Sequence, residues 1–264
     1  MSRTSALTLL LLCLAPVLGA TEQYRADVLE KKAISREFFV QGLEFDGPHL
    51  YLSAGQYHRS QLVRFNFANL EVESRRKLRG DIFAEGVTVL GDKVYQLTWR
   101  KGAMLVYDRE ALTLSHTLPL KGQGWGLTNN GSELIYSDGS DRLYFLDPEN
   151  AAILREIAVT EDGRPVAKLN ELEWIDGEIW ANIWYADRIV IINPQTGVVR
   201  ASIDLRGLLP ASERRANTDV LNGIARDPRD GSIWVTGKYW PWLYRIQPVP
   251  AALETSTPPA AKSR

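Results

Sequence analysis

Five internal repeats constrain the fold of this chain more than any other feature. Each repeat contains a short apolar strand, a polar turn rich in Asp, Asn and Gly, and then a second strand. Two such strands around a turn of this composition are typical of a β-hairpin. The repeats read FVQGLEFDGPHLYLSAG, FAEGVTVLGDKVYQLTW, GWGLTNNGSELIYSDG, LNELEWIDGEIWANIW and LNGIARDPRDGSIWVTGK.

The spacing of the repeats indicates the architecture. They recur every 40 to 52 residues, measured at the residue before the Gly-Leu type of step: Gln41, Glu85, Trp125, Asn170 and Asn222. A third strand, such as LVRFNF or RIVIINP, follows each hairpin, and a fourth, such as LSHTLPL, follows all but the last. Periods of this size with strand signals alone predict propeller blades of four strands. The segment YRADVLEKKAIS supplies the missing strand, so we predict an all-β, five-bladed β-propeller whose N-terminal strand closes the last blade.

Both ends of the chain are predicted to lie outside this domain. Residues 1–20 contain an early base, Arg3, then an apolar run and the small pair Gly19 and Ala20, which is typical of a cleaved signal peptide. An uncleaved anchor is the alternative, although the apolar run is short for a membrane span. Residues 249–264 are rich in Pro, Ala, Ser and Thr, which predicts a disordered tail. The propeller is therefore expected to span residues 21–248, in a bacterial protein that is periplasmic or secreted.

Composition excludes several chemistries. The only cysteine, Cys13, lies in the predicted leader, so the mature chain has no thiol for disulfides or catalysis. With 31 basic and 32 acidic residues, the chain carries no charge excess that would favour nucleic acid. The three histidines, His49, His58 and His116, lie in different repeats without metal-ligand spacing. We expect no metal site, no cofactor, no nucleic-acid partner, no membrane association after signal cleavage, and a monomer.

Two rings of residues are predicted to meet at one mouth of the propeller. The first strand of a blade lines the channel and the second runs antiparallel to it, so the start of one and the end of the other share a face. The strand starts are the five residues named above, and the strand ends are Gly55, Trp99, Gly139, Trp184 and Lys238. Phe39 and Phe83 lie two residues before Gln41 and Glu85, so each pair faces the same side. A carboxylate, an ammonium, three carboxamides and an aromatic wall together predict a ligand pocket.

Several of these residues also have structural interpretations. Asn170 and Asn222 could bond only to backbone groups at loop ends. Lys238 could serve simply as the ion-pair partner of Glu85. Three further carboxylates on the first strands could be structural: Glu44, Glu171 and Glu173.

The motifs FVQGLEF, FAEGVTV, QLTW, GWGL, LNELEW and VTGK, in this order and spacing, resemble those of the plant and bacterial type of glutaminyl-peptide cyclotransferase. The resemblance covers about residues 38–246. It implies a metal-independent, five-bladed propeller that cyclises an N-terminal glutaminyl residue to pyroglutamate and releases ammonia, acting on peptides or proteins. Carried over by motif, it implies Glu85 as the proton-transfer group and Lys238 as the cation, with a pocket made of Phe39, Gln41, Phe83, Trp99, Trp125, Asn170 and Trp184.

Asn222 joins the predicted substrate-binding residues through its ring position alone, and the role of His58 stays open. The chemistry suits such a pocket. The α-amine attacks the carboxamide of its own side chain, so the protein must mainly impose the folded rotamer. One carboxyl group can carry the proton between the two nitrogens, and Gln41, Asn170 and Lys238 could donate to the oxyanion.

Two other classes remain open. A non-catalytic propeller that binds peptides or saccharides could use the same aromatic mouth, although it would not require Glu85 and Lys238. A calcium-dependent lactonase is disfavoured, because the ring lacks the several carboxylates that such an ion demands.

Overall fold

The computed structural model describes residues 20–251, which form β-strands and connecting loops apart from one short 3-10 helix, η1 (Ala211–Glu213). The predicted all-β class is confirmed. Most of the predicted signal peptide, with Cys13, and most of the predicted tail lie outside the described residues. Within residues 20–251, no helix has the length and apolar character needed to cross a bilayer.

Three sheets each contain four consecutive strands in chain order. They correspond to the first three repeats, and neighbouring strands are antiparallel, as the hairpin turns predict. The first sheet contains β2 (Val40–Asp46), β3 (His49–Ala54), β4 (Gln61–Asn66) and β5 (Glu71–Lys77). The second contains β6 (Ala84–Leu90), β7 (Lys93–Thr98), β8 (Ala103–Asp108) and β9 (Leu114–Pro119). The third contains β10 (Leu127–Asn129), β11 (Leu134–Ser137), β12 (Arg142–Leu146) and β13 (Ile153–Ala158).

The last two repeats form one eight-stranded sheet instead of two separate ones. Its order is β16-β17-β18-β19-β1-β22-β21-β20. The strands are β16 (Leu169–Ile175), β17 (Glu178–Ile183), β18 (Arg188–Ile192), β19 (Val199–Asp204), β20 (Leu221–Arg226), β21 (Ile233–Gly237), β22 (Trp242–Pro250) and β1 (Glu22–Ala33). A two-stranded hairpin, β14 (Thr160–Glu161) with β15 (Arg164–Pro165), precedes β16 and was not predicted.

The strand β1 joins the two halves of this sheet. It pairs antiparallel with β22, as predicted for the N-terminal strand, and it also pairs parallel with β19 over Glu22–Arg25. β1 has twelve residues, so it is long enough to pair with both strands. Its first four residues pair with β19, and the residues from Tyr24 onward pair with β22. The predicted start of the tail at residue 249 is wrong, because Val249 and Pro250 pair with Arg25 and Tyr24.

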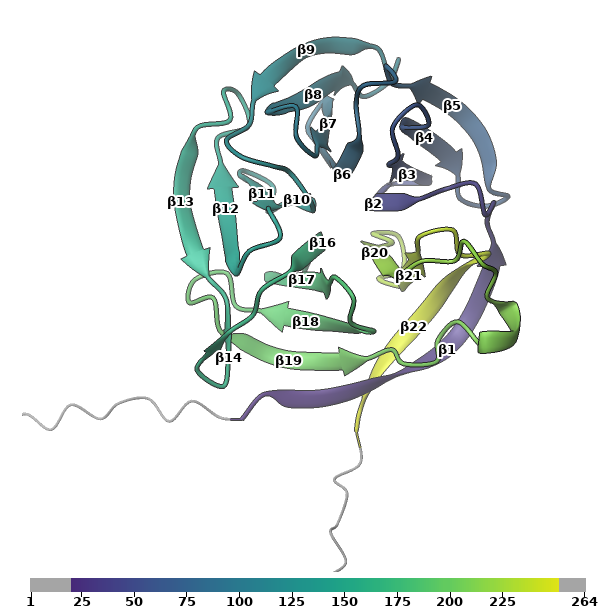
Figure 1. The fold of residues 1–264 in the computed structure, drawn as a ribbon, viewed down its shortest axis with the longest axis vertical. Coiled ribbons are helices and arrows are strands. Elements are labelled where there is room, and N and C mark those ends of the chain that lie inside the picture. Colours follow the sequence, from purple (N-terminus) through teal and green to yellow (C-terminus); the bar gives the residue numbers. More distant parts are fainter. Residues whose placement is uncertain (1–19, 252–264) are drawn as a thin grey trace, which may run out of the picture.

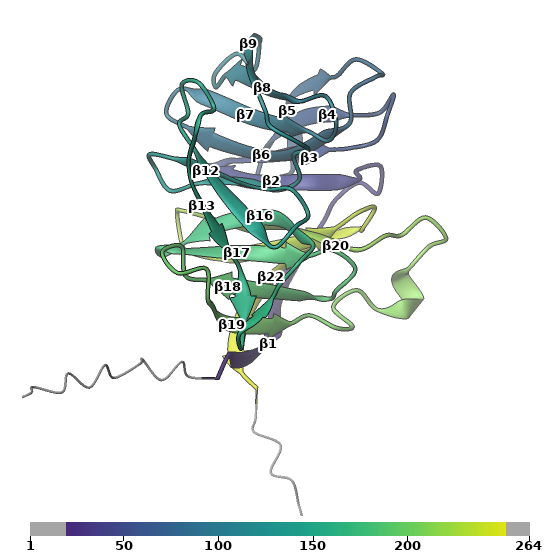
Figure 2. The same ribbon diagram turned by 60° about the vertical axis from the view of Figure 1, so that its left-hand side comes forward.

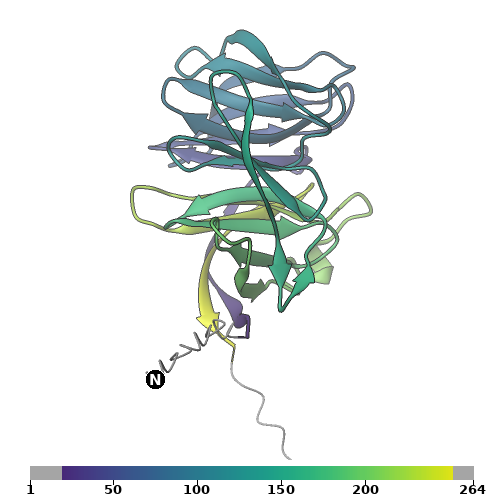
Figure 3. The same ribbon diagram turned by 90° about the vertical axis from the view of Figure 1, so that its left-hand side faces the viewer.

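The sheets stand around a common centre (Figure 1). The strands β2, β6, β10, β16 and β20 are innermost, and each contacts the next around the ring. Seen from the side, the sheets lie one above another, and β1 and β22 lie together at one end of the molecule (Figures 2 and 3). The starts of all five inner strands consequently lie close together.

The glycine of the repeated Gly-Leu type of step explains how closely the inner strands approach. A Cβ atom on Gly126 would lie 1.9 Å from the backbone oxygen of Asn170, so only glycine fits there. The fourth repeat has Glu171 at the equivalent place. Its buried carboxylate accepts hydrogen bonds from the backbone N–H groups of Leu43, at 3.2 Å, and Ile224, at 2.8 Å. The inner ring is thus held by direct backbone packing and by one carboxylate that bridges three inner strands, β16, β2 and β20.

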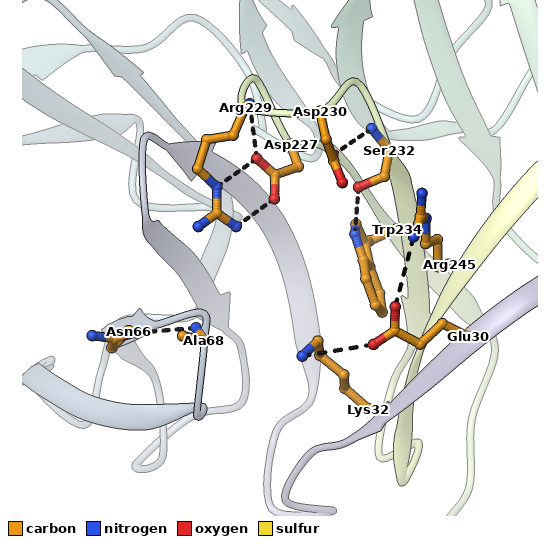
Figure 4. A network of polar contacts seen from close by, with 10 residues as sticks. All are labelled: Glu30, Lys32, Asn66, Ala68, Asp227, Arg229, Asp230, Ser232, Trp234 and Arg245. Atoms are coloured by element: carbon orange, nitrogen blue, oxygen red, sulfur yellow. Dashed lines mark hydrogen bonds and ion pairs between the residues drawn. The ribbon is translucent and has the colours of Figure 1, made fainter.

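Apolar side chains fill the spaces between sheets, and ion pairs lie outside them. Between the first sheet and β20–β22, for example, Leu43, Leu52 and Val63 share a buried cluster with Trp234. On the outer surface, Glu30 of β1 lies 3.7 Å from Lys32 and 3.8 Å from Arg245 of β22 (Figure 4). Exposed pairs of this kind contribute about 1 kcal/mol or less each. The buried apolar area therefore holds the sheets together.

Candidate active site

A pocket of about 210 Å³ opens where the inner strands begin. It contains all the predicted site residues except Asn222. Its lining consists of Phe39, Gln41, Phe83, Glu85, Trp99, Trp125, Asn170, Trp184, Tyr185, Asp219 and Lys238. The two predicted rings therefore meet at one mouth.

The polar residues of the first ring occupy equivalent backbone positions. Gln41, Glu85 and Asn170 are each the second residue of their strands, β2, β6 and β16. Their exposed fractions are 4%, 4% and 2%, respectively. Trp125 lies two residues before β10. The shared register directs three polar groups and one indole to the same end of the central ring.

The second ring follows the ends of the second strands. Trp99, Trp184 and Lys238 come directly after β7, β17 and β21. The two glycines of this ring provide space for rings from other positions. A Cβ on Gly55 would lie 2.5 Å from Cε1 of Phe83, and one on Gly139 would lie 2.6 Å from Cζ2 of Trp125.

The aromatic lining has two walls. On one side, the Phe83 ring lies 6.1 Å from the Phe39 ring and 5.5 Å from the Trp99 ring, both edge-on. On the other side, the rings of Trp125 and Trp184 meet at 5.2 Å and 89°. Edge-to-face pairs resist sliding, because the positive ring edge faces the negative ring face. The pocket is thus bordered by two groups of packed aromatic rings.

The indole N–H groups of the pocket differ in their partners. Trp99 Nε1 donates to Oε1 of Gln123 over 2.7 Å, and the Arg100 guanidinium covers the Trp99 ring at 3.8 Å. The buried Nε1 of Trp125 has no hydrogen-bond partner within residues 20–251. Since a buried N–H without an acceptor costs about 1–3 kcal/mol, this group is available to a ligand carbonyl.

Burial controls the protonation of Glu85. Loss of hydration raises the pKa of its carboxyl well above the ordinary value of 4.5. The positive charge of Lys238 and a hydrogen bond from the Gln41 side chain oppose that rise. The neutral acid form of Glu85 is therefore more populated at a given pH than it would be for an exposed glutamate.

The ammonium of Lys238 experiences the opposite effect. Burial lowers its pKa, and the nearby carboxylates of Glu85 and Asp219 partly restore it. Its Nζ lies 4.7 Å from the centre of the Phe39 ring, which favours the charged form through a cation–π contact. One ammonium is thus held between two carboxyl groups under an aromatic wall.

Asn222 occupies a supporting position. It is the second residue of β20 but has no exposed surface and does not line the pocket. Its Nδ2 donates to the backbone oxygen of Val40 over 3.0 Å and to Oε1 of Gln41 over 3.3 Å. This residue can influence the pocket only through Gln41.

Two lining residues were not predicted from the sequence. Tyr185 follows Trp184 directly, with a positive φ of 65° and a ring 4.4 Å from the Trp184 ring. Asp219 ends the long loop between β19 and β20, which carries η1 and extends away from the sheets in Figure 2. The 52-residue interval between Asn170 and Asn222, the longest between repeats, was the available signal for a functional loop.

The remaining carboxylates of the inner strands bond within the protein. Glu173 Oε1 accepts from the backbone N–H of Arg226 over 2.8 Å, and Glu44 Oε2 accepts from the Thr88 hydroxyl over 2.7 Å. Burial raises the pKa of Glu171 and Glu173, and it raises the pKa of Glu44 to about 8. In the described part of the chain, no three His, Cys, Asp or Glu side chains are grouped to hold a metal ion.

The fold and the pocket define an all-β protein with a buried carboxyl group, Glu85, in a pocket lined by aromatic side chains. The sequence model of the family described as glutamine cyclotransferase matches residues 4–248, so the chain belongs to this family. A glutaminyl-peptide cyclotransferase of Arabidopsis thaliana is 39% identical over 217 residues, which cover 79% of this chain and 67% of the relative. The crystal structure of Myxococcus xanthus glutaminyl cyclase is 33% identical, with a TM-score of 0.82 over 88% of this chain and 99% of that one.

Proposed function

We propose that this protein converts N-terminal glutamine of peptides to pyroglutamate with release of ammonia, and that Glu85 transfers the proton. The observation that carries the proposal is the buried Glu85 carboxyl, with its raised pKa, between aromatic walls and beside Lys238. The family assignment and the names of the two relatives, a glutaminyl-peptide cyclotransferase and a glutaminyl cyclase, support the same reaction.

The pocket favours the folded form of the substrate. A space of about 210 Å³ accommodates one glutaminyl side chain and its amine, but not an extended dipeptide. The walls at Phe83 and Trp125 press the γ-carboxamide back towards the α-amine. Because both reacting groups already belong to one molecule, the protein contributes only the orientation of the folded rotamer, which is less than the about 7–11 kcal/mol that bringing two separate reactants together can supply.

Glu85 then balances the protons of the reaction. The neutral α-nitrogen attacks the side-chain carbonyl carbon and forms the new C–N bond. The Glu85 carboxylate accepts the proton that this nitrogen loses and delivers it to the amide nitrogen. The old C–N bond breaks, ammonia leaves, and Glu85 returns to its starting state. A raised pKa makes the Glu85 carboxylate a stronger base than an exposed glutamate, which suits a group that must take a proton from an amine before it returns it.

The negative charge that develops on the carbonyl oxygen needs donors. Asn170, which is 2% exposed, and Lys238 line the pocket, and the Trp125 indole N–H lacks a partner within residues 20–251. Each such donor typically lowers the barrier by about 3–4 kcal/mol. We assign Asn170, Lys238 and Trp125 to this role.

Three further properties belong to the proposal. We infer that the ring of sheets is a five-bladed propeller, in which β16–β19 and β20–β22 with β1 are the last two blades. We infer that the protein is a monomer. From the leader-like composition of residues 1–20, we infer that it is exported to the periplasm or the exterior. We also infer catalysis without a metal ion, because Glu85 and Lys238 supply the acid, base and cation.

The decisive experiment compares Glu85→Gln with Glu44→Gln. The substitutions remove one carboxyl each from neighbouring inner strands, but only Glu85 lines the pocket. Wild type and Glu44→Gln should convert a glutaminyl peptide with loss of about 17 mass units, while Glu85→Gln should retain less than about 1% of that rate. Chelators should leave the rate unchanged. Peptide binding without any mass loss by the wild type would favour a non-catalytic binding protein instead.

A further inference from the structure

A second cavity, of about 370 Å³, adjoins the pocket. Three chain segments contribute lining residues to both spaces: Arg36 lies three residues before Phe39, Asn217 two residues before Asp219, and Tyr239 directly after Lys238. The ring of Tyr239 lies 5.2 Å from the ring of Phe39. His58 and Arg59 follow Tyr57, whose ring packs 5.4 Å from the Phe83 ring. Other lining residues include Arg75 and Lys77.

The second cavity is strongly basic, although the chain as a whole has a net charge of −1. It has four permanent cations, Arg36, Arg59, Arg75 and Lys77, and one carboxylate, Glu37. Arg75 lies 3.0 Å from Glu37, so this pair is internally neutralised. Within residues 20–251, no carboxylate lies within ion-pair distance of the other three cations.

One of these cations is held in place by the protein. The Arg36 guanidinium donates to the backbone oxygens of Glu213 and Tyr239, at 2.5 and 3.5 Å. Arg59 and Lys77 are exposed, and neither residue lines the pocket. An arginine held by backbone carbonyls and two exposed cations in the same cavity are suited to bind a chain that carries carboxylates.

We infer that this basic cavity binds acidic side chains of the peptide substrate, about three to five residues after the N-terminal glutamine. Phe39 follows Arg36 by three positions, so their Cα atoms lie at most about 11 Å apart. An extended peptide advances about 3.3–3.6 Å per residue and reaches the cavity at that point. The inference rests on the proposed function, and it defines acidic N-terminal segments as the preferred substrates. His58, at the edge of the cavity, would add charge when protonated.

The kinetic test uses two glutaminyl peptides that differ only at the fourth and fifth residues, Asp in one and Asn in the other. The wild type should have a kcat/KM about three- to ten-fold higher for the Asp peptide, from two exposed charge pairs. The preference should disappear at about 1 M salt. Arg59→Gln with Lys77→Gln should lose the preference and keep its rate on the Asn peptide. Lys93→Gln with Arg226→Gln removes the same charge at strand ends opposite the pocket and should keep the preference.

A binding measurement separates this inference from the activity. The same Asp peptide with pyroglutamate as its first residue, labelled at its C-terminus, should bind the wild type several-fold more tightly than the Arg59 and Lys77 double variant. Equal affinities, or equal kcat/KM for the Asp and Asn peptides, would overturn the basic subsite. Failure of the wild type to cyclise either peptide would instead overturn the proposed function, whatever the binding result.

Discussion

Asn222 Nδ2 donates a hydrogen bond to Oε1 of Gln41 over 3.3 Å, and this bond determines which end of the Gln41 amide faces Glu85. With its oxygen engaged, Gln41 presents its NH₂ group to the Glu85 carboxyl, which lowers the pKa of that group. A residue outside the pocket thus controls the electrostatics inside it.

Removal of this bond should reduce turnover more than it reduces binding. In Asn222→Ala the Gln41 amide can rotate and turn its oxygen towards Glu85, so kcat should fall about ten-fold with a smaller change in KM. Stability should fall by about 1–3 kcal/mol, because buried groups lose their partner. The matched control is Asn182→Ala, an equally buried residue that bonds to Gly223 at 2.9 Å but not to Gln41. Equal losses of kcat in both variants would contradict a specific role for Asn222.

Activity should also be sensitive to substitution of Gly139, the glycine beside the Trp125 ring. Gly139 has a φ of +83°, and a Cβ there would meet the Trp125 ring at 2.6 Å. We expect Gly139→Ala to displace the indole and lower kcat/KM about ten- to a hundred-fold. Gly131→Ala is the control, since Gly131 has a φ of +90° in the same sheet but nothing within 4 Å of its Cβ position. Both variants should lose about 1–2 kcal/mol from the left-handed backbone, but only Gly139→Ala should lose activity.

The charge of Lys238 should appear in the pH profile. Its ammonium lowers the pKa of Glu85, so Lys238→Met should raise that pKa further. Because the carboxylate form starts the reaction, the acid limb of kcat/KM against pH should move to higher pH. Lys168→Met is the comparison: Lys168 lies 5.9 Å from the rim residue Tyr185 but is not among the groups that shift Glu85. An acid limb that stays in place in Lys238→Met would exclude electrostatic coupling of the two residues.

The sequence predicted the residues that share a repeated backbone position and missed those that do not. Gln41, Glu85 and Asn170 are found because each repeat places its second inner-strand residue at the same end of the ring. Tyr185 lies in a turn with positive φ that Tyr239 repeats after Lys238 without lining the pocket, so the repeated position alone did not identify it. Asp219 depends on the conformation of a long loop. The parallel pairing of β1 with β19 was also missed, because strand partners across a sheet edge depend on strand length and twist rather than on periodicity.

The buried carboxyl groups of the inner strands should make stability depend on pH. Burial raises the pKa of Glu44 from 4.5 to about 8. Between these values the folded protein keeps a proton that the unfolded chain has lost, so the free energy of unfolding falls as pH rises. The slope from one such group is at most about 1.4 kcal/mol per pH unit, and it ends above the folded pKa.

Glu44→Gln should remove this contribution. Denaturant unfolding measured from pH 5 to pH 9 should give a flatter curve for Glu44→Gln than for the wild type, with the relative gain rising up to about pH 8 and levelling off above it. Residual slope is expected, because burial also raises the pKa of Glu171 and Glu173. Glu149→Gln, at a side chain that is 73% exposed, should follow the wild-type curve. If the Glu44→Gln curve also matched the wild-type curve, Glu44 would have to be ionised in the folded protein throughout this pH range. That result would rule out a neutral Glu44 carboxyl in the inner ring.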